Sequence, residues 1–204
     1  MHNLHAKNNL ACIILTGGLS SRMESHKALL PFSLHQNFLQ HIIEVYQQAG
    51  LKEIIVVKNK EIDFAGLESE INGISTVNNC FPEKGRLYSI QLGLLAAPDA
   101  GFCFIQNIDT PFVTTKIIHQ LAEHKACADY ISPEFNGKGG HPVLLSASIL
   151  KTIAGLIDYT QTLRDVLAGF SRYKIPTTDE QCTLNINTKE DYEQYFSGYK
   201  THRA

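Results

Sequence analysis

Apolar residues in the first half of the chain are concentrated in three short runs, at residues 11–16, 53–58 and 101–106. The first run, ACIILT, is almost entirely apolar and ends in two glycines. A short apolar run bounded by turn residues is typical of a strand buried on both faces of a parallel sheet. The pattern therefore predicts three such strands.

Between these runs the apolar residues recur at helical spacing. Residues 38–49 place Phe38, Ile42 and Tyr46 on one face, and Gly50 follows as a C-terminal stop. Two further helices are indicated by Ile90, Leu94 and Leu95 before Pro98, and by Ile117, Ile118, Leu121 and Ala122. Strands that alternate with helices in this way predict right-handed βαβ units and a sheet with helices on both faces.

The second half of the chain is less regular but continues the α/β pattern. We predict strands at 130–133 and 141–145 around a glycine-rich turn, helices from near Ser146 and Thr162, a short strand at 173–175 and a terminal helix at 188–196. No linker rich in Pro, Gly or Ser divides the chain. The expected organisation is one α/β domain over residues 1–204, with a polar tail at about residues 1–9.

Composition narrows the class of protein. Eighteen Lys and Arg against twenty Asp and Glu give a net charge of −2, which argues against a protein that holds nucleic acid through a basic surface. The five cysteines include no CxxC pair, so we expect reduced thiols in the cytoplasm instead of a zinc ribbon. No run of about eighteen apolar residues is present, so no membrane span is expected.

The segment that follows the first predicted strand has the features of a phosphate-binding loop. Gly17 and Gly18 allow the backbone to approach a phosphate closely, and consecutive N–H groups there form an anion-binding concavity. The loop is neither a P-loop nor a GxGxxG motif. A glycine strand-to-helix turn with surface charges is the alternative interpretation.

Polar and charged side chains complete this loop. Ser20 and Ser21 supply hydroxyl donors, and Arg22 and Lys27 supply two positive charges at the place where open α/β sheets bind ligands. These groups match the needs of a nucleoside triphosphate. The predicted nucleotide-binding residues of the loop are Leu15, Thr16, Gly17, Gly18, Ser20, Ser21, Arg22 and Lys27.

Asp109 is the predicted metal ligand. It follows an apolar run, so it would lie at the carboxyl end of a strand, beside the first loop if the two strands are neighbours. Mg²⁺ often takes one or two protein oxygens together with waters and substrate phosphates. The alternative is an aspartate that caps the helix after Pro111.

Other polar residues carry weaker signals. Asn185 and Asn187 share one side of an extended segment, where their amide oxygens suit a metal shell, although capping is the commoner role. Arg86 and Ser89 suit either a nucleotide contact or an ordinary helix start. His141 alone suits a turn as well as a ligand.

The spacing GG-x-S-x-R-M-x-x-x-K after an apolar strand resembles the MobA-like nucleotidyltransferases, the molybdenum cofactor guanylyltransferases and cytidylyltransferases. The matching residues are Leu15, Gly17, Gly18, Ser20, Arg22, Met23, Lys27, Leu29 and Leu30. Glu24 and His26 stand where the family usually has glycine and often has aspartate. Further similar segments are residues 38–41, 85–94, 107–112, 140–143 and 185–191.

The resemblance implies a fold and a set of roles. The fold is a single-domain, three-layer Rossmann-like structure of the nucleotide-diphospho-sugar transferase (GT-A-like) type, with a mostly parallel sheet. It implies catalytic roles for Arg22, Lys27 and Asp109, and Mg²⁺ held by Asp109, Asn185 and Asn187. The similar segments also imply nucleotide contacts and an acceptor side, at Arg86, Ser89, His141 and Pro142.

The implied activity is the transfer of a nucleoside monophosphate from an NTP to a phosphate acceptor, molybdopterin, with release of pyrophosphate. The pair Gly17-Gly18 favours GTP, while other segments resemble the CTP-dependent branch equally well. A sugar-phosphate or alcohol-phosphate nucleotidyltransferase is an alternative. Because of Glu24 and His26, so is a nucleotide-binding partner in cofactor assembly that lacks catalysis. Contact with other molybdenum cofactor biosynthesis proteins is a further expectation.

Overall fold

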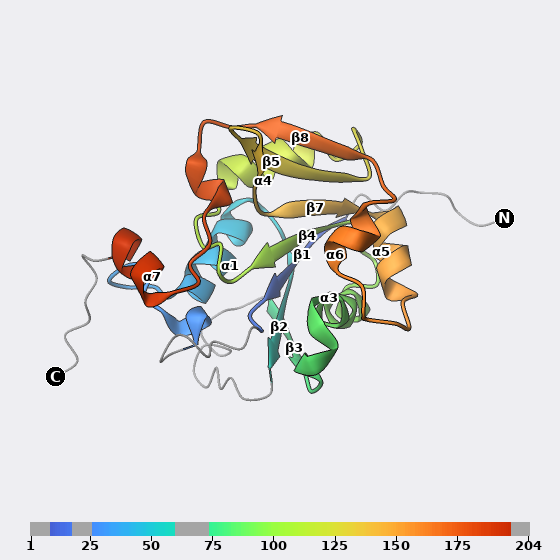
Figure 1. The fold of residues 1–204 in the computed structure, drawn as a ribbon, viewed down its shortest axis with the longest axis horizontal. Coiled ribbons are helices and arrows are strands. Elements are labelled where there is room, and N and C mark those ends of the chain that lie inside the picture. The colour runs from blue at the N-terminus through green and yellow to red at the C-terminus, as the bar shows by residue number, and fades with distance from the viewer. Residues whose placement is uncertain (1–8, 18–25, 60–73, 197–204) are drawn as a thin grey trace.

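The computed structural model describes residues 9–17, 26–59 and 74–196, and within them a twisted sheet lies between two layers of helices (Figure 1). The strand order is β3-β2-β1-β4-β7-β5-β6, with β8 beside β5. The strands are β1 (Leu10–Leu15), β2 (Glu53–Asn59), β3 (Ile74–Asn79), β4 (Phe102–Asn107), β5 (Tyr130–Phe135), β6 (Lys138–Gly139), β7 (Val143–Ser146) and β8 (Arg172–Pro176).

The half of the sheet built from β3, β2, β1 and β4 is parallel, as the alternation of strands and helices predicts. Strand β7 runs antiparallel to both β4 and β5, while β8 is parallel to β5. The predicted α/β class and mostly parallel sheet are therefore confirmed. The three apolar runs correspond to β1, β2 and β4, each shifted or extended by one residue at most.

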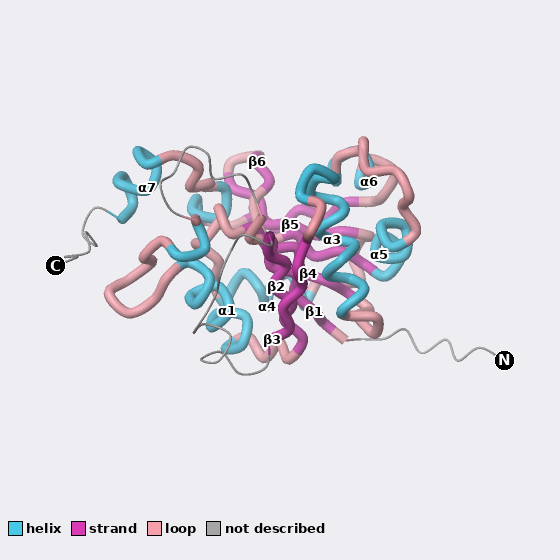
Figure 2. Tube along the Cα trace, turned by 90° about the horizontal axis from the view of Figure 1, so that it is seen from below, coloured by secondary structure: helices cyan, strands magenta, loops and turns pink. Residues whose placement is uncertain are grey.

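Helices cover the two faces of the sheet in separate groups (Figure 2). The first group is α1 (Phe38–Gln48), α4 (Thr115–Glu123) and α7 (Lys189–Phe196), and the second is α3 (Gly85–Ala96), α5 (Ala147–Ala154) and α6 (Leu163–Leu167). Short 3-10 turns are η1 (Lys27–Leu29), η2 (Pro82–Lys84) and η3 (Glu180–Thr183). Within the described part of the chain, no helix is long and apolar enough to cross a membrane.

The side chains of β1 explain why that run is apolar throughout. Cys12 and Ile14 pack into the core beneath α1 and α4, while Ala11, Ile13 and Leu15 pack into the core beneath α3 and α5. Successive strand residues point to opposite faces, so a strand covered on both sides has no position that faces solvent.

Several predicted boundaries are confirmed by local chemistry. Asn37 and Gln40 form a reciprocal cap at the start of α1. Gly50, at φ +86°, follows its end in a conformation that glycine adopts at little cost. Strand β7 begins at Val143, two residues later than predicted, because Pro142 has no N–H for a sheet ladder.

Strand β3 is the element that the hydrophobic pattern misses. Its sequence, ISTVNN, carries only two apolar residues, and it lies at the edge of the sheet, where much of it is exposed. An edge strand with little buried surface needs no continuous apolar run. The predicted binding residues Gly18, Ser20, Ser21 and Arg22, with Glu24 and the polar N-terminal tail to residue 8, lie outside the described residues.

Candidate active site

A pocket of about 580 Å³ opens at the carboxyl ends of the parallel strands. It collects residues from the ends of β1, β2, β3 and β4 and from the described segments after β1, β3 and β4, together with Asn187 from the segment before α7. The lining residues are Leu15, Thr16, Gly17, Lys27, Asn59, Asn79, Pro82, Glu83, Gly85, Arg86, Ser89, Asn107, Ile108, Asp109 and Asn187. Ligands of open α/β sheets bind at this position.

The start of the first loop is fixed against the neighbouring strand. Thr16 donates both its backbone N–H (3.1 Å) and its hydroxyl (3.0 Å) to the carbonyl oxygen of Val57. A Cβ at Gly17 would lie only 2.6 Å from Oδ1 of Asn59, so this position requires glycine unless Asn59 moves. The glycine therefore permits the first loop to pack closely against the end of β2, where both residues line the pocket.

Lys27 opens η1 and points its amine into the pocket. Its Nζ donates to Oδ1 of Asn187 at 2.7 Å. Burial lowers the pKa of Lys27, while the carboxylates of Asp109 and Asp191 oppose that change. Lys27 thus faces the C-terminal segment as well as Asp109.

Asp109 lies beside the first loop, as the sequence predicts for neighbouring strands. Strands β1 and β4 are parallel with Leu15 opposite Asn107, and Ile108 donates its N–H to the carbonyl of Leu15 (3.1 Å). The capping alternative for Asp109 is wrong, because Thr114 caps α4 by accepting the N–H of Ile117.

The carboxylate of Asp109 has an oxygen that is free to accept a hydrogen bond or to bind a cation. Its Oδ1 is buried and has no hydrogen-bond partner among the described residues. Burial raises the pKa of Asp109, while Lys27 and Arg86 oppose that rise. A buried carboxylate oxygen without a donor fits a hard divalent cation, so the residues present suit a metal at this position.

The turn that carries Asp109 is held from beneath by a fully buried glutamine. Nε2 of Gln106 donates to the carbonyls of Asn107 (2.8 Å) and Thr110 (2.9 Å) and to the Thr110 hydroxyl (3.0 Å). Tyr46 of α1 donates its hydroxyl to Oε1 of the same glutamine (3.1 Å). Sequence reasoning missed this network, although a glutamine inside an apolar run is its signal.

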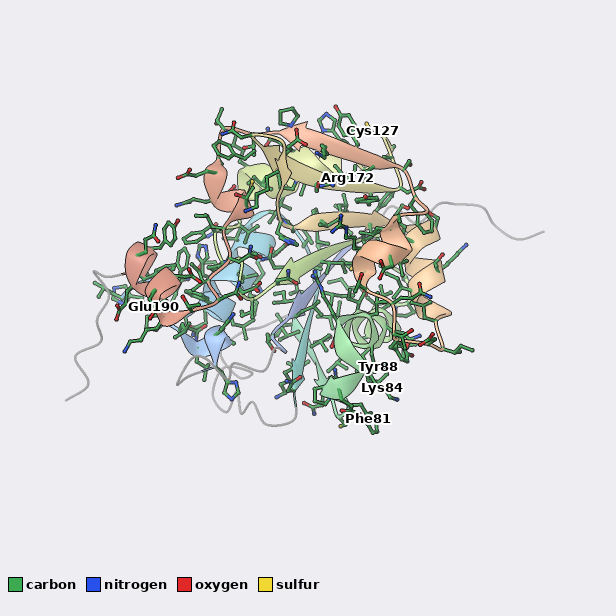
Figure 3. The ribbon with its side chains drawn as sticks, viewed as in Figure 1. Phe81, Lys84, Tyr88, Cys127, Arg172 and Glu190 are labelled. Carbon is green, nitrogen blue, oxygen red and sulfur yellow. The ribbon has the colours of Figure 1, made fainter. Side chains whose placement is uncertain are left out.

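The opposite wall of the pocket is the start of α3. Ser89 accepts a hydrogen bond from Asn79 (2.9 Å), which ties the helix to the end of β3. Burial lowers the pKa of Arg86, and Asp109 opposes this. On the outer side of this wall Lys84 lies over the rings of Phe81 and Tyr88, at 4.6 and 4.7 Å from their centroids (Figure 3).

The two predicted asparagines separate in the structure. Both side chains are exposed, but Asn187 lines the pocket and Asn185 is not among the lining residues. Between them Ile186 is buried and donates its N–H to the carbonyl of Asp109 (2.7 Å). The structure thus brings Asn187, but not Asn185, to the predicted site.

His141 and Pro142 are likewise not among the lining residues. Nδ1 of His141 is buried without a hydrogen-bond partner among the described residues. Burial, with a smaller contribution from Arg86, lowers the pKa of His141 to about 4. The imidazole is therefore neutral near pH 7.

Sequence reasoning also missed several lining residues. Asn59, Asn79 and Asn107 are the last residues of β2, β3 and β4, and they line the pocket together with Glu83. A polar residue that ends an apolar strand is the available signal for two of them. Asn79 had no such signal, because its strand was not predicted.

Two cationic side chains, a carboxylate with a buried, unpaired oxygen and three strand-end asparagines are groups that suit an α/β protein for a phosphorylated ligand. Residues 12–176 match the sequence profile of the MobA-like NTP transferase domain. The chain belongs to this family and is a nucleotidyltransferase, so the family and enzyme class predicted from the sequence are confirmed.

Relatives align over most of the chain. A probable molybdenum cofactor guanylyltransferase of Carboxydothermus hydrogenoformans is 26% identical over 196 residues, covering 91% of this chain and 94% of the relative. The molybdenum cofactor cytidylyltransferase of Escherichia coli is 26% identical over 181 residues, covering 89% and 92%. The fold is also that of Rv0371c from Mycobacterium tuberculosis in complex with manganese (TM-score 0.73, 16% identity, covering 93% of this chain and 98% of that one).

Proposed function

We propose that this protein transfers GMP from GTP to the phosphate of a molybdopterin-type acceptor and releases pyrophosphate. The observation that carries the proposal is the placement of Lys27 and Asp109 in one pocket, on loops that follow two adjacent parallel strands. The family and its relatives named as molybdenum cofactor guanylyltransferases support the reaction and the acceptor.

The proposed metal is Mg²⁺, held by Asp109 with Asn187 nearby; Asn185 stays a prediction as a further ligand. The unpaired Oδ1 of Asp109 supports this placement, as does the manganese complex of the structurally similar mycobacterial protein. When bound, the cation would neutralise charge on the phosphate oxygens.

The chain's own residues would bind and orient the triphosphate. In this proposal the backbone from Gly17 onward, with Arg22 and Lys27, holds the β- and γ-phosphates and stabilises the departing pyrophosphate. Arg86 lies on the facing wall and adds a third cation near Asp109. Preorganised donors of this kind lower the barrier without reorganising during the reaction.

No strong general base is required of the protein. The attacking group is a phosphate monoester, which is already ionised at neutral pH, so positioning and charge neutralisation carry the catalysis. The proposed acceptor side includes His141 and Pro142, which lie outside the pocket lining.

GTP is proposed over CTP because of the Gly17-Gly18 pair and the guanylyltransferase relatives. The cytidylyltransferase of Escherichia coli supports the second candidate, a CTP-dependent enzyme with the same acceptor. The proposed location is the cytoplasm, supported by cysteines that are all free thiols. Contact with other proteins of cofactor assembly stays a prediction.

The experiment is a panel of the four NTPs with Mg²⁺, read as a thermal shift and then as pyrophosphate release with molybdopterin. We expect GTP to raise the unfolding midpoint most and to give a GMP-linked product by mass spectrometry. Stabilisation by CTP but not GTP would overturn the nucleotide. Turnover with a sugar phosphate or an alcohol phosphate, but not molybdopterin, would overturn the acceptor. Binding without turnover at any Mg²⁺ concentration would indicate a non-catalytic partner.

A further inference from the structure

The segment before α7 contacts both loops that carry the proposed charged groups. Asn187 accepts the hydrogen bond of Lys27, with 2.7 Å between Oδ1 and Nζ. The preceding residue, Ile186, donates its backbone N–H to the carbonyl of Asp109 at 2.7 Å. Two consecutive residues of the C-terminal segment therefore tie together loops that are far apart in the sequence.

The start of α7 holds this segment in place. Oδ2 of Asp191 accepts the backbone N–H groups of Asn187 and Thr188, both at 2.9 Å. In return the Thr188 hydroxyl accepts the N–H of Asp191 at 3.1 Å. This reciprocal cap holds the backbone at Asn187 against the first turn of α7, so the position from which the Asn187 side chain meets Lys27 depends on α7.

The helix is also joined to the Lys27 segment farther along the chain. Tyr192 donates its hydroxyl to the carbonyl of Pro31 at 2.8 Å. Its ring centroid lies 6.0 Å from that of Phe38 and 5.0 Å from that of Phe196. The ring thus packs on aromatic neighbours, while the hydroxyl alone reaches the backbone four residues after Lys27.

The last residue of α7 also contacts both the segment after Lys27 and the segment after Asp109, through aromatic rings. The centroid of Phe196 lies 5.5 Å from that of Phe32, which follows the Lys27 segment. The same ring stacks on Phe112, which follows the Asp109 turn, at 5.4 Å. Aromatic pairs at these separations each add a modest stabilisation beyond their buried area.

We propose that residues 186–196 form a strap that sets the position of Lys27 relative to Asp109, and that Tyr192 is a positioning residue of the nucleotide site. The inference rests on the proposed function, because it concerns where Lys27 meets the phosphates. A lysine side chain has large rotamer freedom, and a binding group must be held within about 0.5 Å of its productive position. The strap supplies that restraint through Asn187 and through the backbone at Pro31.

The test is a double-mutant cycle of Tyr192→Phe and Lys27→Met, read as the dissociation constant of GTP with Mg²⁺ by calorimetry. Tyr192→Phe keeps the ring and removes only the hydroxyl. We expect it to weaken binding about fivefold, the equivalent of one net hydrogen bond. In the Lys27→Met background the same substitution should change binding less than about twofold, because its effect passes through Lys27.

Tyr195→Phe is the matched control. It removes a hydroxyl from the same helix, on a side chain that is 37% exposed, and keeps the ring that packs on Phe112. We expect it to leave nucleotide binding unchanged in both backgrounds. A second readout is the rate at which an amine-reactive acetylating reagent modifies Lys27. This rate should rise in Tyr192→Phe and not in Tyr195→Phe.

The outcomes separate the strap from the function on which it rests. An equal loss from Tyr192→Phe in both Lys27 backgrounds, or no loss in the wild-type background, would overturn the strap and leave the function standing. Wild-type protein that binds no nucleotide, or Lys27→Met that binds as wild type does, would overturn the proposed function. In that case the acetylation rate still decides the strap: an unchanged rate in Tyr192→Phe contradicts it.

Discussion

Asp109 and Lys27 are ionisable groups in a partly buried site, and the charge of each one opposes the pKa shift that burial causes in the other. Burial favours the neutral form of both groups, raising the pKa of the carboxyl and lowering that of the amine. Their mutual attraction, with that of Arg86 for Asp109, opposes both changes. A pocket that accepts a polyphosphate and a cation must hold such charges before the ligand arrives, so some stability is sacrificed at this site.

Asp109→Asn separates the role of the Asp109 charge in activity from its cost in stability. We expect turnover to fall by about a hundredfold or more, because the proposed metal loses its carboxylate. In the absence of divalent metal the variant should be more stable than wild type at pH 7. The raised pKa means that the folded state binds the Asp109 proton more tightly than the unfolded chain does. The free energy of unfolding of the wild type therefore falls as the pH rises from the ordinary pKa of 3.8 through the raised pKa of the folded state.

Thermal unfolding in EDTA at pH 7 and at pH 4 checks whether Asp109→Asn is more stable than the wild type and whether this difference depends on pH as expected. The stability advantage of the asparagine variant should shrink at the lower pH, because the raised pKa lets folded wild-type protein take up a proton on Asp109 more readily than the unfolded chain does. Glu123→Gln, at an exposed position of α4 outside the pocket, is the control for removing one negative charge. An Asp109→Asn variant with wild-type pyrophosphate release would contradict the metal assignment.

Lys27→Ala is predicted to reduce turnover by about a hundredfold or more as well, because it removes the cation that we propose stabilises the departing pyrophosphate. Lys174→Ala, on β8 away from the pocket, should retain wild-type turnover. Initial rates of pyrophosphate release at saturating GTP check both variants. Equal rates in Lys27→Ala and wild type would remove Lys27 from the mechanism.

At the scale of elements, the site depends on how β4 ends. Gln106 is the last fully buried residue of that strand, and its side-chain amide donates to the carbonyls of the turn that follows. Tyr46 links the same amide to α1, so the turn that carries Asp109 is held by two elements. Such a buried polar network stabilises one conformation only while every member is satisfied.

Gln106→Met tests this link with a side chain of similar volume. We expect the free energy of unfolding to fall by about 2–3 kcal/mol, because buried carbonyls and the Tyr46 hydroxyl lose their partner. Turnover should fall about tenfold as the Asp109 turn loosens. Urea unfolding and initial rates measure the two effects.

Adding Tyr46→Phe to Gln106→Met provides the control. Removing both partners of one hydrogen bond costs less than removing one of them, so the double variant should regain part of the lost stability. Its turnover should stay low, because the donors to the turn are still missing. Full turnover in either variant would show that the network does not position Asp109.

At the scale of the whole molecule, two histidines make the stability of the fold depend on pH in the acidic range. His41 of α1 stacks on Phe32, with centroids 3.5 Å apart, and burial lowers its pKa to about 4. Burial and Arg86 have the same effect on His141. Both imidazoles are neutral in the folded protein, while in the unfolded chain they take up protons below their ordinary pKa of 6.5.

The free energy of unfolding should therefore fall as pH drops from about 6.5 to about 4, by on the order of 2 kcal/mol for each histidine. The sign follows because the unfolded state binds more protons than the folded state in this window. Urea unfolding at pH 7, 5.5 and 4.5 measures the slope. His41→Gln should reduce it and His35→Gln, at an exposed position, should not; equal slopes in all three proteins would contradict the assignment.

The sequence by itself determined the central half of the fold and the position of the pocket. An all-apolar strand such as β1 can satisfy its side chains only between two helical layers, and the residues that follow it must then lie at the ligand-binding edge. Lys27 and Asp109 could be placed there because both come soon after such strands, and the loop motif was specific enough to indicate the family.

Only the tertiary structure decided which residues meet around that edge. Strand β3 is too exposed to leave an apolar pattern, so Asn79 and the wall that it forms with Ser89 were hidden from sequence reasoning. Asn185 and Asn187 are equivalent by spacing, yet only Asn187 lines the pocket and accepts the hydrogen bond of Lys27. Periodicity along the chain reports which side of an element is buried, whereas contacts between distant segments depend on how the elements pack together.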